Sequence, residues 1–197
     1  MKRQINIPPM LATLVLTGLD VMDGVKFEDG PKVCPDCAGS LSGHDWISRT
    51  FATMREKEVE RDITVRVKRF SCTKCNKIVP ADAPFYPDTR IGSPVVDLVV
   101  ILGKMMPVSR VAAYLETEGI VMSRSSCRNY AERDFGEIPV TPLFGTYIPT
   151  SVLSLSLLAS RFPEGTSVPG AEALRACGFP SADRAGSLRP LPAEKRD

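Results

Sequence analysis

Two short cysteine pairs of identical spacing constrain the fold of this chain more than any other feature. Cys34 and Cys37 stand in the sequence CPDC, Cys72 and Cys75 stand in CTKC, and 34 residues separate the two pairs. Two Cys-x2-Cys turns on adjacent hairpins can place four thiolates around one tetrahedral zinc ion, with no open position for water. The spacing therefore predicts a zinc ribbon that holds one structural Zn²⁺ through these four cysteines.

A thiol–disulfide couple is the competing interpretation, because Cys-Pro-x-Cys is similar to thioredoxin-type sequences. Such a couple needs its first cysteine at a helix N-terminus, where the dipole lowers the thiol pKa. Here CPDC runs into AGSLSG, which predicts a turn, and a second cysteine pair has no redox explanation. A metal site is therefore favoured. His44 is not needed as a ligand, and Cys127 and Cys177 are interpreted as isolated thiols.

The residues between the cysteine pairs have the pattern of β-strands. Residues 63–70 alternate Ile63, Val65 and Val67 with polar residues, which is typical of a half-buried strand. Residues 45–54 alternate less regularly. The charged sequence REKEVERD at 55–62 predicts a solvated turn between the two strands.

The second strand and the second cysteine pair are strongly basic. From Arg61 to Lys77 there are six basic residues and one acid, a local charge of +5 in a chain whose net charge is +2. We expect Arg66, Lys68 and Arg69 to contact the phosphates of nucleic acid, which would add a salt-dependent term to binding without sequence preference.

Helical signals follow a connector at 81–93, where prolines prevent regular structure. Ser93 as N-cap and Pro94 as first helical residue predict a buried helix in SPVVDLVVILGKMM. The next helix, in PVSRVAAYLETEG, should end at Gly119. Ser123 should cap a third helix, in which Cys127 and Tyr130 face inward.

The outward face of this third helix has the residue types that read DNA. Arginine can donate two hydrogen bonds to guanine, asparagine pairs with adenine, and serines near a helix start can hold phosphate. The pattern predicts a helix-turn-helix within 94–136. A polar, solvated helix packed on a small core is the alternative. The candidate DNA contacts on this helix are Ser123, Arg124, Ser125, Ser126, Arg128 and Asn129.

The order of these features resembles a known family. The two cysteine pairs, the connector with YPDTRIGSPVVDL and the helical segment ending GIVMSRSSCRNYAE are similar to the N-terminal, DNA-end-recognising region of insertion-sequence transposases. The resemblance covers roughly residues 30–135. It implies that Cys34, Cys37, Cys72 and Cys75 bind the metal and that residues 123–126 match the SRST-like start of the recognition helix. It also implies specific binding to double-stranded DNA.

The chain departs from those transposases after Phe135. Their catalytic domain has a ribonuclease H-like fold with three carboxylates that hold two metal ions. Here 62 residues follow, with eight prolines, two candidate short helices at 151–162 and 170–178, and a polar end at 187–197 that we expect to be mobile. We therefore expect no enzymatic activity. A catalytic transposase chain, or a second copy of this chain, is the expected protein partner.

The sequence as a whole predicts a cytoplasmic α+β protein that does not enter the membrane. The apolar run at 10–19 is too short to span a bilayer and lacks a signal-peptide cleavage pattern. Two other functions remain open, a zinc-ribbon adaptor or transcriptional regulator and an enzyme with an unrecognised site. The expected units are an N-terminal segment (1–30), a zinc ribbon (31–80), a connector (81–93), a helix-turn-helix unit (94–136) and a proline- and serine-rich C-terminal segment (137–197).

Overall fold

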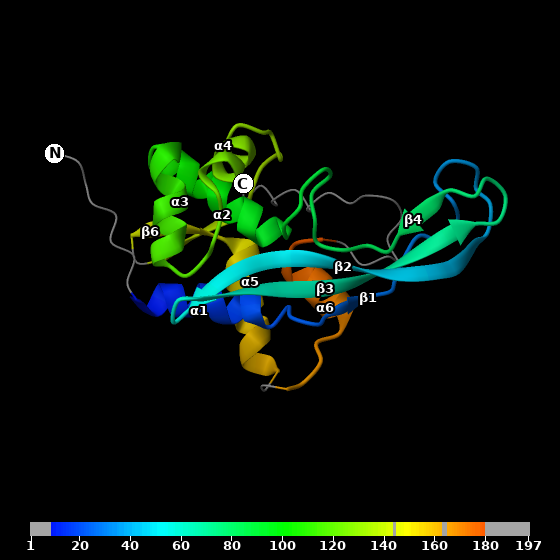
Figure 1. The fold of residues 1–197 in the computed structure, drawn as a ribbon, viewed down its shortest axis with the longest axis horizontal. Helices are drawn as coiled ribbons and strands as arrows, with labels where there is room; N and C mark the ends of the chain where they lie inside the picture. The colour runs from blue at the N-terminus through cyan, green and yellow to red at the C-terminus, as the bar shows by residue number, and fades with distance from the viewer. Residues whose placement is uncertain (1–8, 144, 163–164, 180–197) are drawn as a thin grey trace, which may run out of the picture.

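The computed structural model describes residues 9–143, 145–162 and 165–179, and it confirms the α+β class (Figure 1). A long β-hairpin runs along the molecule, with helices above, behind and below it in this view. The elements are, in chain order, α1 (Pro9–Asp20), β1 (Lys26–Phe27), β2 (Leu41–Glu56), β3 (Val59–Cys72), β4 (Ile78–Pro80), α2 (Ser93–Met105), α3 (Val108–Thr117), α4 (Arg124–Ala131), β5 (Val140–Leu143), β6 (Thr146–Pro149), α5 (Thr150–Arg161) and α6 (Gly170–Ala176).

The hairpin of β2 and β3 confirms the strands expected at 45–54 and 63–70, but both strands are longer. The solvated turn expected over 55–62 is confirmed only at Lys57 and Glu58, because the rest of that segment continues the two strands. Lys57 and Glu58 have positive φ values of 47° and 68°, so two residues are enough to reverse the chain. Oppositely charged side chains face each other across the paired strands beside this turn.

The strand β3 is the centre of the main sheet. It pairs with β2 on one edge, and with β1 and β4 on the other, where β1 is parallel and β4 antiparallel. Ile63, Val65 and Val67 are buried, as their alternation predicts. In Figure 1, α5 and α6 lie behind β2 and β3, so the helices cover one face of the sheet.

The helix α1 packs closely against α5, although the two are far apart in the sequence. A Cβ atom on Gly18 would lie 2.8 Å from the backbone nitrogen of Ser156, so only glycine permits this approach. The Ser156 hydroxyl also donates a 2.7 Å hydrogen bond to the carbonyl of Leu14. One hydrophobic cluster extends from α1 through the sheet to α2–α6.

The helix α2 begins one residue earlier than the sequence predicts. Its N-cap is Gly92, not Ser93, and Ser93 is fully buried with no partner for its hydroxyl among the described residues. Gly92 donates a 2.8 Å hydrogen bond to the carbonyl of Phe51. A Cβ atom at Gly92 would lie 2.3 Å from the Phe51 ring, so this contact with the sheet requires glycine at the helix start. The predicted end of α3 is confirmed, since Gly119 follows it with φ of 83°.

The C-terminal part contains a short hairpin that the sequence analysis did not predict. The strands β5 and β6 pair antiparallel, and Gly145 in the turn has φ of 78°. The two helices predicted after this point are confirmed as α5 and α6. The mobility expected at 187–197 concerns residues outside the described ranges. Within those ranges, no helix has both the length and the apolar character needed to cross a bilayer.

Candidate functional site

The four cysteines lie in two loops at the end of the long hairpin opposite its turn. Cys34 and Cys37 precede β2, while Cys72 ends β3 and Cys75 follows it. Each loop is closed by the same backbone bonds: the nitrogen four residues after the first cysteine donates to its carbonyl, at 2.9 Å in the first loop and 3.0 Å in the second. These two loops are therefore a matched pair.

The position after each second cysteine needs a left-handed backbone. Ala38 has φ of 54° and Asn76 has φ of 60°. Asparagine tolerates this region well, whereas alanine is strained there. Glycine would therefore fit position 38 with less strain than the alanine that stands there.

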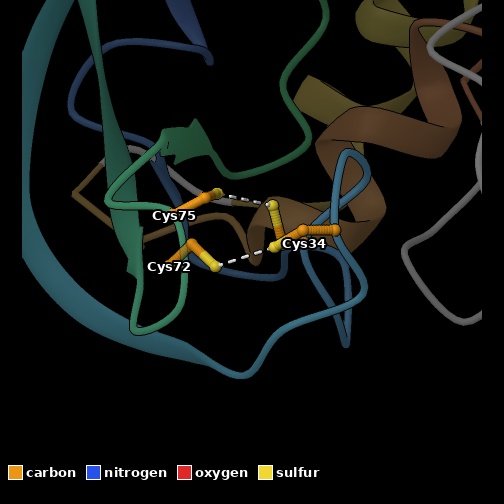
Figure 2. Close-up of side chains that lie close together, drawn as sticks. Cys34, Cys72 and Cys75 are labelled. Carbon is orange, nitrogen blue, oxygen red and sulfur yellow. Dashed lines mark hydrogen bonds between the residues drawn. The ribbon is translucent and has the colours of Figure 1, made fainter.

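The sulfur atoms of the four cysteines form one compact group. All four lie within 4.8 Å of one another. The Sγ atoms of Cys34 and Cys75 are 3.7 Å apart, and those of Cys37 and Cys72 are 3.5 Å apart. Figure 2 shows the sulfurs of Cys34, Cys72 and Cys75 turned toward a common centre from the two loops. A tetrahedral ion with metal–sulfur bonds of about 2.3 Å needs sulfur separations of about 3.8 Å, so the group fits one metal ion.

The pKa values of two thiols in this group, Cys72 and Cys37, are shifted in opposite directions. Backbone N–H groups of Cys75 and Lys74 lower the pKa of Cys72 to about 6. The Gly39 N–H also lowers the pKa of Cys37, but the neighbouring thiols of Cys75 and Cys72 outweigh it and raise that pKa to about 12. Four adjacent thiolates repel one another, and a divalent cation at their centre removes this penalty.

The helix α4 is built as the sequence predicts. The Ser123 hydroxyl accepts a 3.1 Å hydrogen bond from the Ser126 nitrogen, which confirms Ser123 as the N-cap. Cys127 and Tyr130 are buried and anchor the helix to the core. The outer side chains are exposed, namely Arg124, Ser125, Arg128 and Asn129, and Ser126 is partly exposed.

The turn between α3 and α4 is fastened to the edge of β2. The Arg55 nitrogen donates to the Gly119 carbonyl, and the Val121 nitrogen donates to the Thr53 carbonyl, each at 2.8 Å. Arg55 also forms an ion pair with Glu116 of α3. These bonds fix the position of α4 relative to the long hairpin.

The three basic residues proposed for β3 do not share one face of the sheet. Arg66 and Lys68 lie on the face turned away from the helices, and their charges are 5.5 and 5.9 Å from the ring centre of Trp46. Arg69 lies on the other face, because successive side chains of a strand alternate. It makes two hydrogen bonds to Asp45, of 2.7 and 2.5 Å, which lower the pKa of that carboxyl.

Asp97 is a residue whose role the sequence analysis missed. It is 4% exposed in α2, and its two carboxylate oxygens accept 2.6 Å hydrogen bonds from Tyr86 and Ser151. The available signal was a lone acid within the apolar sequence VVDLVVIL. The nearest polar residue on the same helix is Ser93, four positions earlier, but its hydroxyl makes no hydrogen bond among the described residues, so Asp97 finds its partners elsewhere in the core.

Comparison of the chain with protein-family models, with curated proteins and with solved structures finds no match. The features that bear on function are therefore the cysteine group, the outer face of α4 and the face of the sheet that carries Arg66 and Lys68.

Proposed function

We propose that this chain is a zinc-containing DNA-binding protein with the organisation of the DNA-recognition region of an insertion-sequence transposase. The observation that carries the proposal is the structure of α4. Ser123 caps this helix, and the buried side chains of Cys127 and Tyr130 anchor it to the core. Arg124 and Arg128 extend from it into solvent. In this proposal α3 and α4 form a helix-turn-helix, and α4 enters the major groove.

Zinc is the metal that best suits the cysteine group. Thiolate ligands are soft, and four of them in tetrahedral arrangement favour zinc over magnesium or calcium, which prefer oxygen ligands. With four protein ligands the site is closed, so the ion has a structural role. It holds together two loops that lack an extensive hydrophobic core of their own, and it forms with β2 and β3 a zinc ribbon.

The DNA contacts divide between two surfaces. Arg128 and Asn129 offer the donors and acceptors that distinguish base pairs in the major groove. Arg124 and the serines lie at the start of α4, where the dipole favours phosphate. Arg66 and Lys68 supply contacts without sequence preference. Cutting and joining of DNA would be carried out by a separate catalytic chain.

The experiment that tests the proposal is selection of bound sequences from random duplex DNA by the zinc-loaded protein. We expect a defined motif, and we expect Arg128→Ala to relax the preference at particular positions by about 1 to 3 kcal/mol. Lys104→Ala, which removes an exposed cation from α2, is the matched control and should leave the motif unchanged.

The same experiment separates the alternatives. If no sequence is enriched and the Arg124→Ala variant binds duplex DNA as well as the wild type does, α4 does not read DNA. The zinc ribbon would then be better interpreted as part of a protein-interaction adaptor.

A further inference from the structure

The open face of the sheet carries the only tryptophan of the chain, placed between cations. Trp46 lies opposite Lys68 in the register of β2 and β3, and Arg66 is two residues before Lys68 on the same face. The guanidinium carbon of Arg66 is 5.5 Å from the Trp46 ring centre, and Lys68 Nζ is 5.9 Å from it. Lys68 Nζ is also 5.5 Å from the ring centre of Phe70. The aromatic and basic side chains thus alternate over one surface.

The paired strands give this surface a positive charge, and the nearest acid beside β1 is the exposed Glu28, just beyond the end of that strand and two residues after Lys26. Lys26 in β1 pairs with Arg66 in register, so its exposed side chain leaves the sheet on the same face. On this face, between Thr64 and Phe70 and in the strand positions opposite, the described residues include three cations and no acid. The nearest acids along β3 are already engaged, since Asp62 accepts a hydrogen bond from Thr53 and Glu60 pairs with Arg55.

We infer that this face binds unpaired nucleotides of single-stranded DNA, with one base stacked on Trp46 and with Lys26, Arg66 and Lys68 on the adjoining phosphates. The inference rests on the proposed function in taking DNA as the nucleic acid, but it assigns a ligand to a surface other than α4. Trp46 acts here as a stacking residue, a role separate from the reading of base pairs.

The physical argument is that stacking selects unpaired bases. The bases of a duplex are stacked on each other and cannot reach an aromatic ring on a flat sheet, whereas the bases of a single strand can. Stacking of a base on an aromatic ring is stronger than an exposed cation–π contact. A base therefore displaces the cations from the Trp46 ring, and their long side chains then contact the phosphates on either side.

Because Trp46 is the only tryptophan, its fluorescence reports on this face directly. The zinc-loaded full chain is titrated with an oligothymidylate of about 12 nucleotides, which lies within the range of about 4 to 16 nucleotides bound by a single OB fold in other proteins, and with a hairpin duplex of the same nucleotide count. We expect quenching that saturates with the single strand and a weaker change with the duplex. Equal quenching by both DNAs would overturn the inference.

Variants measured with a dye-labelled oligothymidylate test the stacking contact. Trp46→Leu should weaken binding about 10- to 100-fold, and Trp46→Phe should retain most of the affinity because the ring remains. Zinc content and circular dichroism verify that each variant folds.

The double variant Arg66→Gln, Lys68→Gln keeps Trp46 and should reduce the salt dependence of binding by about 1.4 in log–log slope. The control Lys104→Gln should change neither. Unchanged affinity in Trp46→Leu would contradict the inference.

Failure of this inference can be distinguished from failure of the proposed function. Arg124→Ala should weaken duplex binding and leave binding of the single strand unchanged, and Trp46→Leu should do the reverse. If Arg124→Ala has no effect on the duplex while Trp46→Leu still weakens single-strand binding, the inference stands and the role of α4 falls. Tighter binding of oligouridylate than of oligothymidylate would overturn the assignment to DNA.

Discussion

The hydroxyl of Tyr86 donates a 2.6 Å hydrogen bond to the carboxylate of Asp97, and this buried contact joins the segment after the sheet to α2. Burial raises the pKa of Asp97 to about 6. The hydrogen bonds from Ser151 and Tyr86 lower this pKa, but their effect is smaller than that of burial. The ordinary pKa of an aspartate in an unfolded chain is about 3.9. Between pH of about 4 and 6 the folded state therefore binds more protons than the unfolded state, and stability falls as pH rises through this window.

The first prediction follows from this shift. Between pH 5 and pH 7.5 the wild type should lose about 1 kcal/mol more of its unfolding free energy than Asp97→Asn, which has no proton to release. Urea unfolding of both proteins at the two pH values, at one fixed zinc concentration, measures the difference. The comparison cancels contributions from thiols and from other carboxylates. Equal losses in the two proteins would show that Asp97 titrates normally.

The second prediction concerns the metal. Purified protein should contain about one zinc ion per chain, and Cys72→Ser should lose the ion and unfold the cysteine loops, because structural zinc contributes folding free energy on the order of 10 kcal/mol in zinc-finger peptides. Cys127→Ala, at a buried cysteine outside the group, is the control and should keep its zinc. Elemental analysis and thiol titration decide the matter. Metal-free protein with a redox-active Cys34–Cys37 pair would refute the site.

The third prediction separates the two faces of β3. Lys68→Gln should lower the salt slope of DNA binding by about 0.9, the value for one phosphate contact. Arg69→Gln should leave this slope unchanged, because Arg69 lies on the opposite face and is occupied by Asp45. The slopes are read from binding isotherms at several salt concentrations. Equal reductions in both variants would mean that the face of the side chain does not matter.

The fourth prediction concerns the cap of α4. Ser123→Ala should lower stability by about 1 kcal/mol, because the Ser126 nitrogen loses its acceptor. Ser125→Ala is the matched control, since its hydroxyl contacts only the Ser123 hydroxyl among the hydrogen bonds of this turn. Hydrogen exchange at the first turn of α4 should increase in the first variant only. Similar exchange in both would exclude a capping role for Ser123.

The fifth prediction is that the chain binds DNA without cutting or joining it. Two-metal phosphoryl transfer needs carboxylates gathered around ions about 3.5 to 4 Å apart. Here the carboxylate of Asp97 is occupied by Tyr86 and Ser151, and that of Glu116 by Arg55. Incubation of the preferred duplex with magnesium or manganese should give no nicking. Metal-dependent nicking that copurifies with the chain through several columns would reveal an active site.

The features that depend on short-range chemistry could be predicted from the sequence. The spacing of the cysteines sets the sulfur group, the alternation at 63–67 sets the buried face of β3, and Ser123 with Gly119 sets the ends of α4 and α3. Each of these is signalled by residues a few positions apart, and only the meeting of the two cysteine pairs joins distant segments.

The features that depend on distant contacts could not be predicted. Gly92 replaces Ser93 as the cap because the Phe51 ring lies against it. The partners of Asp97 come from two other parts of the chain. The charged segment at 55–62 forms strands because its charges pair across the hairpin and with α3. The polarity of this segment predicted a loop, but pairing between the two strands extends them through most of it.

The contact between Leu14 and Ser156 has a consequence for the order of synthesis. These residues are 142 positions apart, and a ribosome that adds about 5 to 20 residues per second needs about 7 to 30 s to pass from one to the other. During that time the apolar side of α1 has no α5 to cover it, whereas the cysteine loops and the long hairpin are fully synthesised before the middle of the interval. The nascent chain thus completes its hairpin and cysteine loops before α1 can pack on α5, which makes this interval the one in which chaperones have most to protect.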